Sequence, residues 1–200
     1  MIEKADQQMT NPQFAGMHLS CCIWAMEGHS ENPVAALIEA GYRYMDIRAT
    51  DFRDIDARPA LSVSSVGLSF GIPDGHSLDD SDMERSIETG RHVRNALEHA
   101  GWCQVTSAYV VPGFDTSSNA VARFAGQLVH LAEQASEHDI KICVEHFPGR
   151  GLPTVAATLS LLRDIGHPNL YLLLDTGHTQ ISGEDPAQAV NDAGDRLGYV

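Results

Sequence analysis

The side chains best placed for chemistry are Glu145, Asp175 and His178, because each follows an apolar run along the chain. Glu145 lies in residues 140–147 (IKICVEHF), and the other two lie in residues 170–179 (LYLLLDTGHT). Continuous apolar runs of this kind are typical of strands buried on both faces of a parallel sheet. Active sites of parallel α/β folds lie at the carboxyl edge of the sheet, where both runs end. The sequence therefore predicts one shared site for metal binding or proton transfer.

The residue types at this site point to a divalent cation. Carboxylate oxygens with an imidazole nitrogen suit Mn²⁺, Co²⁺ or Zn²⁺, whereas carboxylates alone suit Mg²⁺. A charged Glu145 within an apolar strand is costly to bury unless it is paired or bound to a metal. Gly177 is expected to let the backbone turn tightly, so that His178 folds back beside Asp175. The plainer alternatives are that Glu145 is an ordinary carboxylate at a strand end, and that Asp175 caps the next turn with His178 on the surface.

The elements that must position these residues alternate between strand and helix, which is typical of a parallel βαβ fold. Expected strands lie at residues 17–23, 42–48, 61–70, 104–111, 140–147, the apolar start of 170–179, and 197–200. Expected helices lie at residues 34–40 (with Ser30 as the cap and Pro33 in the first turn), 79–100, 118–137, 155–165, and from 185 onward. Residues 1–16 are polar and aperiodic, so a flexible N-terminal arm is expected before a single domain over 17–200.

The length of the chain bears on how complete this fold is. An eightfold β/α barrel usually needs about 250 residues, and this chain has 200 and stops at the start of its seventh expected strand. We therefore expect either a barrel with about six to seven of its strands, lacking the C-terminal ones, or a smaller open sheet.

The composition excludes several classes of protein. Hydrophobic residues make up 43% and charged residues 20%, as in globular domains, and no run is apolar enough to span a membrane. The N-terminus lacks a signal-peptide pattern, so a cytoplasmic location is expected. The formal net charge of −14 argues against a nucleic-acid partner, since phosphate binding requires basic residues. The four cysteines form no C-x-x-C pair and are expected to be buried, reduced thiols.

Weaker candidates for substrate contact lie at or just after the ends of other expected strands. These are Trp24, Arg48, His76 and Tyr109, for each of which packing or surface exposure is an equal alternative. His146 is a further candidate, although side chains alternate along a strand and it need not share the direction of Glu145.

Taken together, the motifs resemble the xylose isomerase-like TIM-barrel superfamily, which includes sugar isomerases and epimerases, dehydratases and endonuclease IV-type enzymes. The resemblance covers roughly residues 17–200 and is carried by VEHFPGRG, with Glu145, and LLLDTGH, with Asp175 and His178. It implies an eight-stranded β/α barrel with its site at the carboxyl mouth. It also implies that Glu145 and Asp175 are metal ligands and that His178 contacts metal or substrate.

The chain also departs from the family pattern. Relatives add a metal-binding His on strand seven and a Glu on strand eight, and the sequence ends at LGYV before either. The nuclease branch has histidines after strands three and four, where this chain reads VGLSFGIP and SAYVVPGF. A nuclease is therefore not expected.

The resemblance implies a divalent-metal-dependent isomerase or epimerase, with Mn²⁺ as the expected metal, acting on a sugar or sugar derivative by enediolate proton transfer. Glu145 would bridge metal and substrate and move the proton, Asp175 would be a ligand, and His178 would hold a substrate oxygen. The alternatives are a lyase or dehydratase on the same barrel, or a non-catalytic barrel fragment. A homo-oligomer is a further expectation, because an unclosed barrel exposes strand edges.

Overall fold

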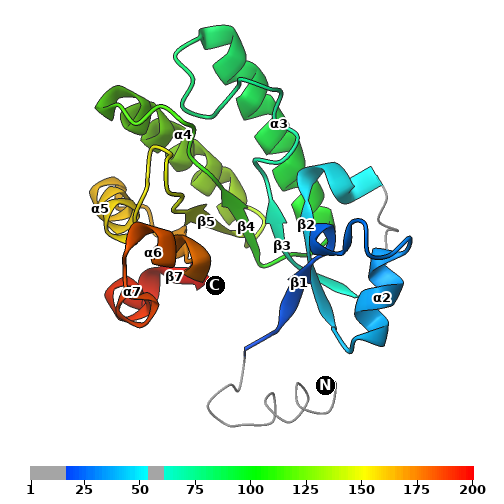
Figure 1. The fold of residues 1–200 in the computed structure, drawn as a ribbon. Coiled ribbons are helices and arrows are strands. Elements are labelled where there is room, and N and C mark those ends of the chain that lie inside the picture. Colours follow the sequence, from blue (N-terminus) through cyan, green and yellow to red (C-terminus); the bar gives the residue numbers. More distant parts are fainter. Residues whose placement is uncertain (1–16, 54–60) are drawn as a thin grey trace.

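The computed structural model describes residues 17–53 and 61–200, so the arm expected at 1–16 lies outside the described part. Seven parallel strands form one curved sheet in the order of the sequence (Figure 1). Each strand pairs with the next one along the chain, and among the described strands β1 and β7 form the two edges. This confirms the α/β fold class and the open section of a barrel. The strands are β1 (Ser20–Cys22), β2 (Tyr44–Arg48), β3 (Ser62–Gly67), β4 (Ser107–Val110), β5 (Lys141–Glu145), β6 (Leu170–Leu173) and β7 (Leu197–Tyr199).

Helices connect the strands, and the longer ones lie outside the curved sheet (Figure 1). Their first turns are capped by side chains that accept hydrogen bonds from free backbone N–H groups. The α-helices are α2 (Pro33–Glu39), α3 (Met83–Trp102), α4 (Ser118–Ser136), α5 (Val155–Ile165), α6 (Thr176–Ser182) and α7 (Pro186–Ala193). Short 3₁₀ turns are η2 (Ile23–Met26), η3 (Ala49–Arg53) and η4 (Gly194–Arg196). Among the described residues, no helix has the length and apolarity needed to cross a membrane.

Two expected helix starts differ from the structure for reasons of capping. Asn32, not Ser30, caps α2, because its side chain accepts from the N–H of Ala35. The helix expected from residue 79 begins at Met83, because Asp82 accepts from two N–H groups of the first turn. Asp79 is instead buried and accepts a hydrogen bond from the N–H of Gly113 at 3.0 Å. The side chain of Asp79 therefore joins two loops instead of starting a helix.

Side-chain alternation divides each strand between two apolar surroundings. On β5, Ile142 and Val144 belong to the main core with Phe124 of α4 and Leu162 of α5. Cys143, between them, belongs to a smaller cluster with Tyr109 and Leu173 on the concave side of the sheet. Odd-numbered residues of β5 therefore face the interior of the barrel and even-numbered residues face the helices. Glu145 follows the first set and His146 the second.

Candidate active site

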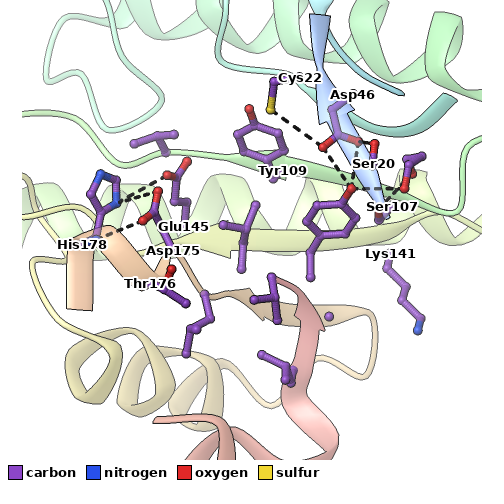
Figure 2. Close-up of a pocket in the computed structure, with 18 of the residues that line it drawn as sticks. Ser20, Cys22, Asp46, Ser107, Tyr109, Lys141, Glu145, Asp175, Thr176 and His178 are labelled. Atoms are coloured by element: carbon purple, nitrogen blue, oxygen red, sulfur yellow. Dashed lines mark hydrogen bonds and ion pairs between the residues drawn. The ribbon is translucent and has the colours of Figure 1, made fainter. Parts of the chain in front are cut away.

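A cavity of about 1100 Å³ occupies the concave side of the sheet. One end is lined by Glu145, Asp175 and His178, and the other end reaches Lys141 at the start of β5 (Figure 2). Trp24 and Tyr109 also line the cavity. The carboxyl ends of the strands thus open into one concave space, the usual place for ligand sites of parallel α/β folds. The cavity is large enough for a small molecule of several functional groups.

Glu145, Asp175 and His178 converge at the carboxyl end of this cavity, as Figure 2 shows. The Nδ1 atom of His178 lies 3.5 Å from Oε1 of Glu145 and 3.7 Å from Oδ2 of Asp175. One ligand atom from each residue lies within 4.8 Å of the others. Glu145 ends β5, Asp175 follows β6, and His178 lies in α6. The three groups meet because β5 and β6 pair in parallel and end at the same edge of the sheet.

The first turn of α6 holds two of these residues together. Asp175 is the N-cap, and its Oδ1 accepts a hydrogen bond from the backbone N–H of His178 at 2.9 Å. The tight turn expected at Gly177 is wrong, because this residue is helical and does not have a positive φ. The pitch of the helix, not a glycine turn, returns the imidazole to the carboxylate. Asp175 therefore caps the next turn, as the plainer alternative expected, and also lies in the candidate site. The His178 side chain is only 15% exposed, so it does not lie on the surface.

A carbonyl group fixes the ring of His178. The backbone oxygen of His146 lies 3.0 Å from Nδ1 of His178, and the ring of Phe147 packs 4.1 Å away, centre to centre. A carbonyl only accepts, so this bond places the proton on Nδ1. The neutral ring then carries its lone pair on Nε2.

The electrostatic surroundings of the site affect Glu145 most clearly. Burial and then the neighbouring Asp175 carboxylate raise the pKa of Glu145 to about 7, and Arg150 acts in the opposite direction. One atom from each of the two carboxylates and the imidazole lies within 4.8 Å of the others, and these donor types suit Mn²⁺, Co²⁺ and Zn²⁺. Because Nδ1 of His178 carries the proton, the imidazole could bind a cation only through Nε2. A divalent cation between the carboxylates would offset both the burial and the repulsion. The residues therefore fit a metal.

The predicted substrate contacts separate into two groups. Trp24 and Tyr109 line the cavity with Glu145 and His178. His146, fully buried on the helix side of the sheet, is not part of the cavity wall. Its two ring nitrogens have no hydrogen-bond partner among the described residues.

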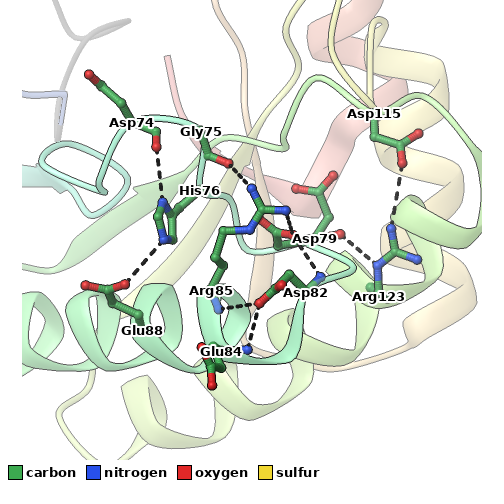
Figure 3. Close-up of polar contacts among 11 residues, drawn as sticks. Asp74, Gly75, His76, Asp79, Asp82, Glu84, Arg85, Glu88, Asp115 and Arg123 are labelled. Atoms are coloured by element: carbon green, nitrogen blue, oxygen red, sulfur yellow. Dashed lines mark hydrogen bonds and ion pairs between the residues drawn. The ribbon is translucent and has the colours of Figure 1, made fainter.

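Arg48 and His76 also lie off the cavity wall. The Arg48 guanidinium pairs with Glu27 and Asp51, which satisfies its charge. His76 pairs with Glu88 of α3 at 3.3 Å and contacts the backbone oxygen of Asp74 (Figure 3). Each is engaged in fixing a loop, so its local partners explain it without a ligand.

Sequence reasoning missed a polar group inside the barrel, here named the interior cluster: Ser20, Asp46, Ser64 and Tyr199. The Tyr199 hydroxyl donates to Asp46 at 2.8 Å and lies 3.1 Å from Ser64 Oγ. Ser20 also donates to Asp46, at 2.8 Å (Figure 2). Burial raises the pKa of Asp46. The signal was Asp46 within an otherwise buried strand; its partners come from three other strands and cannot be read from spacing.

Comparison with known proteins places this architecture in a family. Residues 34–200 match the model of the xylose isomerase-like TIM barrel. An L-ribulose 3-epimerase of Methylomonas sp. (strain DH-1) is 27% identical over 88% of this chain and 67% of its own length. The chain thus spans about two thirds of the length of the curated relatives it matches along most of its sequence.

Solved structures share the fold. A crystal structure of D-allulose 3-epimerase from Methylomonas sp. in complex with D-allulose superposes with a TM-score of 0.76 at 23% identity, covering 92% of this chain and 70% of that one. The IOLI protein with a bound zinc atom superposes with a TM-score of 0.73 at 17% identity, covering 90% and 70%. With the family model matching most of its length, the chain belongs to the xylose isomerase-like TIM-barrel family.

Proposed function

We propose that the protein is a divalent-metal-dependent isomerase or epimerase of sugars or sugar derivatives, with ketose 3-epimerisation as the leading reaction. The observation that carries the proposal is the convergence of Glu145, Asp175 and His178 at the carboxyl end of the barrel cavity. The similarity to an L-ribulose 3-epimerase along most of the chain supports the type of reaction. The zinc atom in the IOLI structure supports metal binding on this fold.

Glu145 and Asp175 would hold the metal, with His178 beside them. When bound, a divalent metal acts as a Lewis acid and stabilises negative charge that develops on a carbonyl oxygen. Mn²⁺ is the metal we propose, and Co²⁺, Zn²⁺ and Mg²⁺ are its competitors. Asp175 has one oxygen bound to the N-cap and the other directed toward His178, so its role is to hold charge in a fixed position.

Glu145 is the group proposed to move the proton. A carboxylate takes a proton from carbon only in its ionised form, and a base is most effective with a pKa near the working pH. In the metal-free protein the pKa of Glu145 is about 7. A bound cation would lower it, which would keep the carboxylate ionised and able to accept a proton at neutral pH. Returning the proton to the adjacent carbon on the same face isomerises the substrate. Inverting one carbon requires a second proton donor on the opposite face, so epimerisation needs a further group beyond these three.

His178 would orient the substrate. With Nδ1 donating to the His146 carbonyl, Nε2 can accept a hydrogen bond from a sugar hydroxyl. Tyr109 and Trp24, which line the same cavity, would pack against the carbon chain. These contacts exclude water from the reacting carbon, which strengthens charge interactions there.

Deuterium exchange at carbon tests the proposal directly. The protein is incubated with Mn²⁺ and a panel of ketoses in ²H₂O, and nuclear magnetic resonance follows deuterium entering at the carbon next to the carbonyl. Glu145→Gln is expected to slow exchange by about 10²–10⁴-fold while the circular dichroism spectrum stays unchanged. Glu98→Gln, an exposed carboxylate of α3, is the matched control. Exchange at the wild-type rate in Glu145→Gln would refute the proposed role, and loss of water from the substrate would indicate a dehydratase instead.

A further inference from the structure

Arg150 is a cation held beside the active site by aromatic rings. It lies in the loop between β5 and α5 and lines the same cavity as Glu145 and His178. Its guanidinium carbon lies 4.0 Å from the centre of the Phe114 ring and 4.9 Å from that of Phe147. Nη1 donates a hydrogen bond to the backbone oxygen of Pro112 at 3.0 Å. Two rings and a carbonyl therefore fix the guanidinium at the cavity wall.

This cation lacks a direct counterion within the described part of the chain. Arg48, Arg85 and Arg123 each form an ion pair with a carboxylate, whereas Arg150 forms none with the carboxylates of residues 17–53 and 61–200. Its Nε is shielded from solvent and has no hydrogen-bond partner there. Burying a donor of a charged group without a partner is unfavourable, so the contacts of Arg150 within the protein do not by themselves account for its position.

The surrounding charges favour keeping Arg150 ionised. Burial lowers its pKa from the usual value, while the more distant carboxylates of Glu145 and Asp79 act to raise it. An arginine side chain remains protonated under these conditions, because its ordinary pKa lies far above neutrality. The wall of the cavity therefore carries a fixed, partly desolvated positive charge.

We propose that Arg150 binds an oxyanion of the substrate, a carboxylate or a phosphate carried by the sugar chain. The inference rests on the proposed function for the identity of the reacting site and narrows its substrate class to acidic sugar derivatives. A planar guanidinium held between rings forms strong charge-assisted hydrogen bonds with either group. The competing role is structural: Arg150 only offsets the charge of Glu145, in which case neutral and acidic sugars are affected alike.

Three ligands with one carbon chain separate these roles: D-fructose, D-fructuronate and D-fructose 6-phosphate. Calorimetry measures their dissociation constants on the full chain with Mn²⁺ present. The variants are Arg150→Gln, Arg150→Lys and the control Arg91→Gln, an exposed arginine of α3. The wild type is expected to bind at least one acidic ligand about 10-fold more tightly than D-fructose. The preferred acidic ligand then tells carboxylate from phosphate.

Arg150→Gln is expected to weaken acidic-ligand binding about 10- to 100-fold and to leave D-fructose binding within about twofold, with Arg91→Gln like wild type. Equal wild-type affinity for the three ligands, or equal weakening of all of them in Arg150→Gln, would overturn the inference. Arg150→Lys retains the charge and keeps the comparison valid if the glutamine variant fails to fold. Selective binding of an acidic ligand without deuterium exchange would support the role of Arg150 and reject the proposed reaction. Deuterium exchange without a preference for acidic ligands would support the reaction and reject the role of Arg150.

Discussion

Replacing Glu145 with Gln should stabilise the metal-free protein at neutral and higher pH. The side chain of Glu145 is only 12% exposed, and its pKa of about 7 compares with an ordinary value of 4.5. The folded state therefore binds this proton more tightly than the unfolded state. Stability from Glu145 is fully present below about pH 4.5, is lost as the pH rises toward 7, and stays lost above it.

The size of the effect follows from the difference of about 2.5 between the two pKa values. Each pKa unit corresponds to about 1.4 kcal/mol, so ionising Glu145 costs the folded protein about 3 kcal/mol at about pH 8. Glutamine has nearly the same shape and cannot ionise. Glu145→Gln should therefore raise the free energy of unfolding by about 3 kcal/mol at that pH and leave it nearly unchanged at about pH 4.

Urea unfolding between about pH 4 and pH 8, with a chelator present, measures this difference. Glu98→Gln removes an exposed carboxylate of α3 and should follow wild type throughout. Addition of Mn²⁺ should reverse the ranking at high pH, because a cation stabilises ionised Glu145 and has less to bind in the glutamine variant. Parallel stability curves for wild type and Glu145→Gln would show that the carboxylate is not desolvated in the folded protein, and the reasoning would fail.

Three further changes test the fold and the site. Asp175→Asn should keep the α6 cap but weaken Mn²⁺ binding at least about 10-fold in calorimetry. Asp175→Ala should weaken binding as well and also lower the free energy of unfolding by about 1 kcal/mol. Equal stability of the two variants would show that the cap does not stabilise the protein. Tyr199→Phe removes the hydroxyl that bonds Asp46 and should cost about 1–3 kcal/mol in urea unfolding; no loss would mean that water replaces it. Phe124→Ala, in the core between α4 and the sheet, should cost about 3–5 kcal/mol; a cost below about 1 kcal/mol would place Phe124 outside a packed core.

The sheet could be predicted because β5 and β6 are nearly continuous apolar runs and because expected strands alternate with expected helices, with turn residues between them. The helix at residues 155–165 has the expected bounds, since Thr154 caps it and Gly166 ends it in the left-handed region with φ of 68°. Expected strands such as 140–147 extend beyond the paired residues, because apolar side chains continue into the loops where strand pairing has stopped. The apolar pattern of a sequence indicates which residues are buried, and buried residues continue past the last hydrogen-bonded residue of a strand.

The site could be predicted only in part, because spacing along the chain identifies strand ends but not side-chain directions beyond them. Glu145 and Asp175 were found because two paired parallel strands must end together. Arg150 was not found, because its position depends on Phe114, a residue of another loop. Tyr199 was not found either, since its bond to Asp46 joins residues 153 positions apart. Contacts of this kind arise from the curvature of the sheet and leave no periodic signal in the sequence.

At Asp175 one carboxylate caps a helix and is also the proposed metal ligand, and its two oxygens separate these roles. Oδ1 accepts the N–H of His178 and starts α6, while Oδ2 lies 3.7 Å from the Nδ1 atom of the same residue. A helix cap needs only one acceptor atom, so the second remains available to a cation. Because the cap fixes the backbone of His178, the geometry of the site is set by the same bond that begins the helix. Capping and metal binding are therefore compatible, and a strand that ends on a capping carboxylate presents a preorganised ligand at the mouth of the barrel.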